Sequence, residues 1–246
     1  FGELFSTFYS VRGLQKSRSD IFRPGFSFSS IRLRFRELVP LSLPLTANRV
    51  LLGLLQGIEA VSIPGCLKLY NHSTSEALST YGVLTGMALP CILFPSAITN
   101  SVSIMLMPTV AELQVKDQAS GIRKLLQKVL GSCFLMGLFC CLFFLFFGQL
   151  IGQFLFASDL AGNFIITLAW ICPFLYVNGS LLSVLNGFGK TTTSFTINMV
   201  GLAIRIGSVF FAIPVFGIQG YLWGLLISQL AVSICCSVVL KHLISA

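Results

Sequence analysis

The sequence predicts an all-α integral membrane protein, and three observations lead to this fold class. Hydrophobic residues make up 55% of the 246 residues and charged residues only 10%, whereas charged residues make up about 25% of soluble domains. The mean hydropathy is +0.88. Apolar runs of about 20 residues or more, long enough to cross a bilayer, recur along the chain and are separated by short polar loops.

Six apolar runs have the length of a spanning helix. They cover residues 38–64, 80–110, 128–148, 161–185, 192–213 and 218–240, within one predicted region of six helices at 38–240. Residues 1–10 predict the end of a preceding transmembrane helix, and residues 11–37, rich in Arg and Ser, predict a basic linker. The chain begins at Phe1 without the features of a signal peptide, so we expect a longer parent protein.

The basic residues predict the orientation of the six helices. Thirteen of the 16 Lys and Arg residues lie before the first run, in the second and fourth loops or at the C-terminus, whereas the alternate loops carry only Lys68. The positive-inside rule therefore places the linker and the tail at 241–246 in the cytoplasm. Because the charges are dispersed between apolar runs, we expect no nucleic-acid partner despite a net charge of +8.

The reactive residues form no recognisable catalytic or metal site. Seven of the eight cysteines lie within apolar runs, where they are expected to pack as small apolar side chains. No Cys-x-x-Cys pair, Cys/His cluster or catalytic motif is present. We therefore expect no enzyme activity, no metal and no cofactor.

Arg49 and Arg205 each lie deep inside an apolar run. A charged residue in the middle of a membrane helix costs about 2.5–3.5 kcal/mol on insertion scales, and such residues usually face a partner or a water-filled cavity. Glu59 is the only acidic residue within the six runs, and one carboxylate cannot pair both arginines well. We expect at least one guanidinium to face a cavity, where phosphate is a suitable counter-charge.

Polar residues follow helical spacing in three of the runs. They are Thr46, Arg49, Gln56 and Glu59 in the first run, Ser96, Thr99, Asn100, Ser103 and Met107 in the second, and Ser194, Asn198, Gly201, Arg205 and Ser208 in the fifth. Two interpretations remain open, because such faces either line a cavity or hold helices together by hydrogen bonds. The candidate cavity residues are Arg49, Arg205, Glu59, Asn48, Gln56, Asn100, Thr99 and Asn198. Glycines four residues apart, at 53 and 57, 82 and 86, and 220 and 224, predict close helix contacts.

Several strings resemble a known family. They are Pro44-Leu45-Thr46-Ala47-Asn48-Arg49, Glu59-Ala60, Tyr81-Gly82-Val83-Leu84-Thr85-Gly86-Met87-Ala88-Leu89-Pro90, Phe94-Pro95-Ser96-Ala97-Ile98-Thr99 and Leu185-Asn186-Gly187-Phe188-Gly189-Lys190. Together they resemble the C-terminal half of the stage V sporulation protein B and polysaccharide-biosynthesis transporter family. This family belongs to the multidrug/oligosaccharidyl-lipid/polysaccharide flippase superfamily.

The resemblance implies a fold and a function. It implies one six-helix lobe of a two-lobed flippase or antiporter fold, in which the N-terminal lobe of the same protein would complete a central cavity. The implied substrate is a lipid-linked anionic saccharide, such as an undecaprenyl-pyrophosphate sugar of peptidoglycan synthesis, flipped across the bacterial plasma membrane by alternating access in spore cortex or envelope formation. Its pyrophosphate would suit Arg49 and Arg205.

Two alternatives remain at this stage. A cation-coupled multidrug antiporter shares the fold but would typically use intramembrane carboxylates, of which Glu59 is the single candidate. A non-transporting membrane scaffold for cell-wall enzymes would need the polar faces only to hold helices together.

Overall fold

The computed structural model describes residues 9, 12, 50–70, 73–115 and 119–245. The chain divides into two units, Phe1–Ala47 and Asn48–Ala246, and the second unit holds the helices discussed below. The predicted cavity residues Asn48 and Arg49 lie outside the described residues, as does almost all of the predicted segments 1–10 and 11–37.

The described residues are helical and contain no strand, which confirms an all-α membrane protein. Within the described ranges, five helices are long and apolar enough to cross a bilayer: Val50–Leu69, Thr74–Leu93, Gly121–Phe156, Thr191–Phe216 and Ile218–Leu243. A sixth candidate is the pair α7 (Asp159–Ala169) and α8 (Cys172–Gly187), which is bent by 55°. These six candidates correspond in number to the six predicted runs.

Prolines interrupt several of these spans. The helix Thr74–Leu93 consists of α3 (Thr74–Val83), the π-helical turn η1 (Leu84–Ala88) and α4 (Leu89–Leu93), with Pro90 in the first turn of α4. Similarly, α9 (Thr191–Gly207) continues through the π-turn η2 (Ser208–Ala212) into α10 (Ile213–Phe216), where Pro214 is in the first turn. Because proline removes a donor and its ring clashes with the carbonyl four residues earlier, a widened turn before it relieves the conflict.

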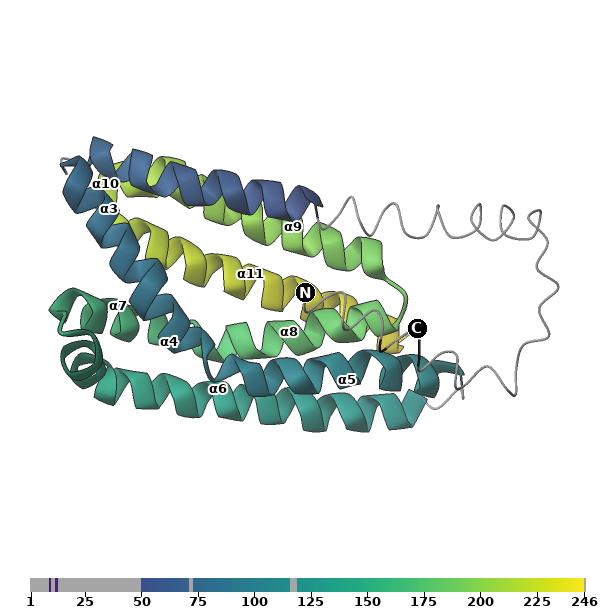
Figure 1. Cartoon of the computed structure of the whole chain (residues 1–246). Coiled ribbons are helices and arrows are strands. Elements are labelled where there is room, and N and C mark those ends of the chain that lie inside the picture. The colour runs from purple at the N-terminus through teal and green to yellow at the C-terminus, as the bar shows by residue number, and fades with distance from the viewer. Residues whose placement is uncertain (1–8, 10–11, 13–49, 71–72, 116–118, 246) are drawn as a thin grey trace. The chain divides into compact units, whose positions relative to one another are not determined.

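The predicted span at 80–110 is not one continuous helix. The helical segment ends at Leu93, a turn follows at Phe94 and Pro95, and α5 (Ser96–Val115) begins at Ser96. In Figure 1, α3 and α4 cross the view obliquely, whereas α5 runs alongside α6 (Ala119–Phe156) and α8. The hydroxyl of Tyr176 on α8 donates to the carbonyl of Ile92, 2.9 Å away, and thereby connects α8 to α4.

The helices α9 and α11 (Ile218–Ser245) pack against each other along their length, as Figure 1 shows. Small residues allow this approach. A Cβ added at Gly224 would lie 2.1 Å from Ser208 Oγ, and one at Gly220 would lie 2.6 Å from the carbonyl oxygen of Ala212. The predicted close contact at this glycine pair is confirmed. At the other predicted glycines, 53, 57, 82 and 86, an added Cβ would meet no described atom within 4 Å.

The buried side chains form two apolar clusters. The first contains Ile63, Leu84, Phe144, Tyr176 and Leu222 among others. The second is built by different stretches of α5, α6, α8, α9 and α11, and includes Leu106, Leu126, Val184, Ile197 and Val232.

Polar residues occupy the stretches of helix that lie between the two clusters. On α8 they are Asn178 and Ser180, on α11 Ser228 and Gln229, on α9 Arg205, and on α5 Thr99 and Ser103. A polar layer therefore separates the two apolar clusters, and the candidate site lies in it.

Candidate functional site

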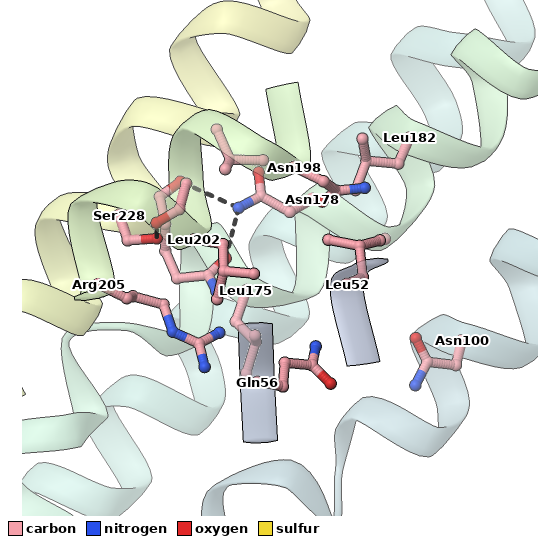
Figure 2. Close-up of a pocket in the computed structure, with 14 residues that line it drawn as sticks. Leu52, Gln56, Asn100, Leu175, Asn178, Leu182, Asn198, Leu202, Arg205 and Ser228 are labelled. Atoms are coloured by element: carbon pink, nitrogen blue, oxygen red, sulfur yellow. Dashed lines mark hydrogen bonds between the residues drawn. The ribbon is translucent and has the colours of Figure 1, made fainter. Parts of the chain in front are cut away.

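A cavity of about 400 Å³ opens within the polar layer. Five helices line it: the Val50–Leu69 helix, α5, α8, α9 and α11. Five carboxamide side chains contribute to its wall, together with one guanidinium: Gln56, Asn100, Asn178, Asn198, Gln229 and Arg205. Leucines and Val232 supply the apolar part of the lining, and Figure 2 labels four of these leucines, Leu52, Leu175, Leu182 and Leu202.

Arg205 reaches the cavity wall from α9 and is bonded to Glu59 of the Val50–Leu69 helix. Its Nε donates to Glu59 Oε1 over 2.9 Å, and its Nη2 forms an ion pair with Glu59 Oε2. The hydroxyl of Tyr221 on α11 donates to the same Oε1 over 2.8 Å. Glu59 is 3% exposed and the Arg205 side chain 24% exposed. Three helices therefore meet at one buried carboxylate.

This ion pair changes the expectation drawn from the sequence. We expected an arginine that lacks a good partner to face a cavity, but Arg205 both lines the cavity and has a two-bond carboxylate partner. A guanidinium has further N–H groups beyond the two bonded to Glu59, and Arg205 lines the cavity. The local charge of the pair is close to zero.

Four of the eight predicted cavity residues line the cavity, namely Arg205, Gln56, Asn100 and Asn198. Glu59 lies behind Arg205 as its partner. Thr99 does not reach the lining: it is 3% exposed, and its hydroxyl donates to the carbonyl of Ser96, 3.0 Å away. Asn48 and Arg49 lie outside the described residues.

Sequence reasoning missed Asn178 and Gln229. The Nδ2 of Asn178 donates to the carbonyl oxygen of Gln229 over 2.9 Å and to Gln229 Oε1 over 2.7 Å. Neither was assigned to a polar face, although Gln229 is followed by Ser233 and Ser237 at a spacing of four residues. An Asn or Gln in the middle of an apolar run was the signal available, because such a group needs a partner or water at membrane depth.

Hydroxyl groups deeper in the layer join helices rather than line the cavity. Ser103 of α5 and Ser180 of α8 lie 2.9 Å apart, Oγ to Oγ, and Cys133 Sγ of α6 lies 3.3 Å from the same Ser180 Oγ. Ser183 donates to the carbonyl of Ser103. The two interpretations of the polar faces are not exclusive: these hydroxyls connect helices, whereas Arg205 and Asn178 line the cavity and also bond to a neighbouring helix.

The polar groups of the cavity wall are suited to hydrogen bonding with a ligand. These groups are carboxamides, one guanidinium and the Ser228 hydroxyl, which itself donates to the carbonyl of Gly201 over 2.8 Å. Among the described residues, no group of three or more His, Cys, Asp or Glu side chains is placed to hold a metal ion.

Comparison with known proteins gives two relatives. The chain is 26% identical over 223 residues to stage V sporulation protein B of Bacillus subtilis (strain 168), covering 89% of this chain and 43% of that protein. It is 26% identical over 93 residues to the sporulation protein YkvU of the same organism, covering 38% of this chain and 21% of that protein.

The chain thus spans less than half the length of the curated relatives it matches. No family model matches the sequence, and no solved structure matches it significantly. The apolar helices and this relationship together describe a multi-pass membrane protein. The family resemblance inferred from the sequence is confirmed: over 89% of its length, this chain is similar to stage V sporulation protein B.

Proposed function

We propose that this chain forms part of a membrane transporter that flips a lipid-linked anionic saccharide by alternating access, in spore cortex or cell-envelope synthesis. The observation that carries the proposal is the cavity of about 400 Å³ between spanning helices, with five carboxamides and Arg205 in its wall. Polar groups at membrane depth are expensive unless they pair or line a wet space. A cavity built from them supplies a polar compartment for a head group that cannot enter lipid.

The relationship to a sporulation protein supports the biological setting of the proposal. The chain covers 43% of that relative, so we propose that a second lobe completes the cavity. We also propose that both ends of the helical block face the cytoplasm at the bacterial plasma membrane. Arg123, Lys124 and Lys128 support this orientation, because they are exposed in the first turns of α6.

The antiporter alternative has less support from the described residues. Coupling to a cation would require an intramembrane carboxylate that can exchange its partner. Glu59 accepts hydrogen bonds from both Arg205 and Tyr221, and 97% of its surface is buried. A cation would have to displace a guanidinium already bonded through two nitrogens.

A flipping assay tests the proposal. The complete protein that contains this chain would be reconstituted in liposomes with a fluorescent undecaprenyl diphosphate disaccharide, and the fraction reached by a membrane-impermeant quencher would be followed over time. We expect faster exposure than in protein-free liposomes. Arg205→Lys should slow it by about 3- to 10-fold, because lysine keeps the charge but loses the planar two-bond contact.

Phe195→Ala is the matched control on the same helix, since Phe195 does not line the cavity. Its rate should equal that of the wild type. A non-transporting scaffold would give the protein-free rate for all three proteins, and that result would reject the proposal.

A further inference from the structure

The acceptor oxygen of Asn178 is buried and has no partner. Asn178 is 4% exposed and lines the cavity, and its Oδ1 forms no hydrogen bond. The orientation of this carboxamide is fixed, because its Nδ2 donates to the backbone carbonyl of Gln229, a group that can only accept. A buried acceptor left unpaired costs about 1–3 kcal/mol. Among the described residues, no donor is placed to pair with Asn178 Oδ1, so a bound ligand could supply one.

Three further carboxamides in the wall also lack a protein partner. Within the described ranges, the side chains of Gln56, Asn100 and Asn198 form no hydrogen bond. Each carboxamide presents two donor hydrogens and an accepting oxygen. Figure 2 shows Gln56 and Asn100, from different helices, around the same space as Arg205. These three side chains therefore present both unpaired hydrogen-bond donors and unpaired acceptors to the cavity.

The wall carries almost no net charge. Of the described residues that line the cavity, Arg205 alone is ionised, and Glu59 neutralises it through two bonds. An anion moved into this space would lose its water and gain little net attraction in return. Uncharged groups with both O–H donors and oxygen acceptors would meet matching partners on every side.

The apolar part of the wall fits the same kind of ligand. Leu52, Leu175, Leu182 and Leu202 line the cavity between the carboxamides. A sugar ring presents hydroxyl groups at its rim and C–H groups on its faces, and mixed apolar and polar walls are typical of small-molecule sites. The volume of about 400 Å³ lies within the usual range of such sites, about 300–1,000 Å³.

We infer that this cavity binds the uncharged glycosyl part of the substrate, with Asn178 Oδ1 accepting from a sugar hydroxyl or N-acetyl N–H. The inference rests on the proposed function for the identity of the ligand as a lipid-linked saccharide. It assigns the diphosphate to a place outside the carboxamide wall. Specificity would then depend on the sugar and not on the charge of the carrier.

Binding measurements on the complete protein in lipid nanodiscs test the inference. The probes are a polyprenyl diphosphate that carries an N-acetylated disaccharide, the same lipid without sugar, and the free disaccharide. We expect the sugar-bearing lipid to bind about tenfold or more tightly than the bare lipid. Asn178→Leu should weaken binding of the sugar-bearing lipid by about 3- to 10-fold, the usual value of one hydrogen bond, and leave the bare lipid unchanged.

Asn198→Leu is the second variant, because the Asn198 side chain lines the cavity and bonds to no other described side chain, so we expect its replacement to leave the fold intact. This variant should also weaken binding of the sugar-bearing lipid and leave binding of the bare lipid unchanged. Asn163→Leu is the matched control, since Asn163 is an exposed asparagine on α7 away from the cavity. Melting temperatures in the same nanodiscs identify any variant that fails to fold.

Three results would overturn the inference: equal affinity for the two lipids, wild-type affinity in both cavity variants, or no binding of the sugar-bearing lipid. A free disaccharide that binds as tightly as the lipid-linked form would overturn the assignment to a lipid-linked sugar. The flipping assay distinguishes a failure of this inference from a failure of the proposed function. Sugar-selective binding without flipping rejects only the transporter, and flipping without sugar selectivity rejects only this inference.

Discussion

The contact between α9 and α11 differs in kind from the contact that the Val50–Leu69 helix makes with the same two helices. Between α9 and α11 the backbones approach so closely that a Cβ at Gly201 would lie 2.5 Å from Val232 Cγ2. On the Val50–Leu69 helix, a Cβ at Gly53 or Gly57 would meet no described atom within 4 Å. No side chain from Val50 to Ile58 is buried.

The Val50–Leu69 helix packs Ile63 and Leu67 into the first apolar cluster, and it adds a polar contact with α9 and α11. Glu59 accepts from Arg205 of α9 and from Tyr221 of α11. Close backbone packing has one geometry and resists sliding, whereas an ion pair can break and form again with another partner. We therefore expect α9 and α11 to move as one unit during transport, and the Val50–Leu69 helix to move relative to them.

The largest loss of stability is expected when one partner of the Glu59–Arg205 ion pair is removed. Arg205→Ala leaves Glu59 buried without a cation, which typically costs about 3–5 kcal/mol. The melting temperature of the complete protein in detergent should fall markedly. The double variant Glu59→Gln with Arg205→Met should recover most of the loss, because no charge stays unpaired. A double variant as unstable as the single one would show that the ion pair itself, and not the orphaned charge, sets the stability.

A smaller loss is expected from forcing α11 away from η2, the π-turn that continues α9. Gly220→Leu places a side chain against the backbone of Ala212, which cannot rotate away, and overpacking of this kind costs about 1–3 kcal/mol. Gly53→Leu is the control, since the added side chain meets open space. Melting curves should show a clear decrease for Gly220→Leu and none for Gly53→Leu. Equal decreases in both would contradict the distinction between the two contacts.

The smallest effect is expected at Ser228. Its hydroxyl donates to the carbonyl of Gly201 over 2.8 Å, within the close α9–α11 contact. Hydrogen bonds between membrane helices are worth about 0.6 kcal/mol on average. Ser228→Ala should therefore lower the melting temperature only slightly. A large decrease would mean that this pair depends on polar bonds as the Val50–Leu69 helix does.

The sequence predicted which segments form helices better than it predicted which helices contact one another. Apolar length gave the number of candidate spans, and helical spacing placed Asn198 and Arg205 on one face, where both line the cavity. The glycines at 220 and 224 correctly marked a close contact, but those at 53, 57, 82 and 86 did not. Small residues permit close approach without requiring it, so their spacing alone does not identify a partner.

The rest of the site depends on contacts between residues far apart in the chain. Glu59 meets Arg205 across 146 residues and Tyr221 across 162, and Asn178 meets Gln229 across 51. A single sequence contains no information on which helices become neighbours. The break at Phe94 and Pro95 was also missed, because prolines within an apolar run are compatible with a continuous kinked helix as well as with a turn.

The length of α6 fixes the depth at which the cavity lies. Twenty residues separate Lys128 from Gln149, a rise of about 30 Å, which equals the thickness of the hydrocarbon core. The midpoint falls near Leu138, next to Gly137, whose added Cβ would touch Pro173 of α8. Cys133, one to two turns away, contacts Ser180. Asn178 lies between these two levels, so its unpaired oxygen is within about 8 Å of the middle of the bilayer. A sugar bound there would be halfway across the membrane.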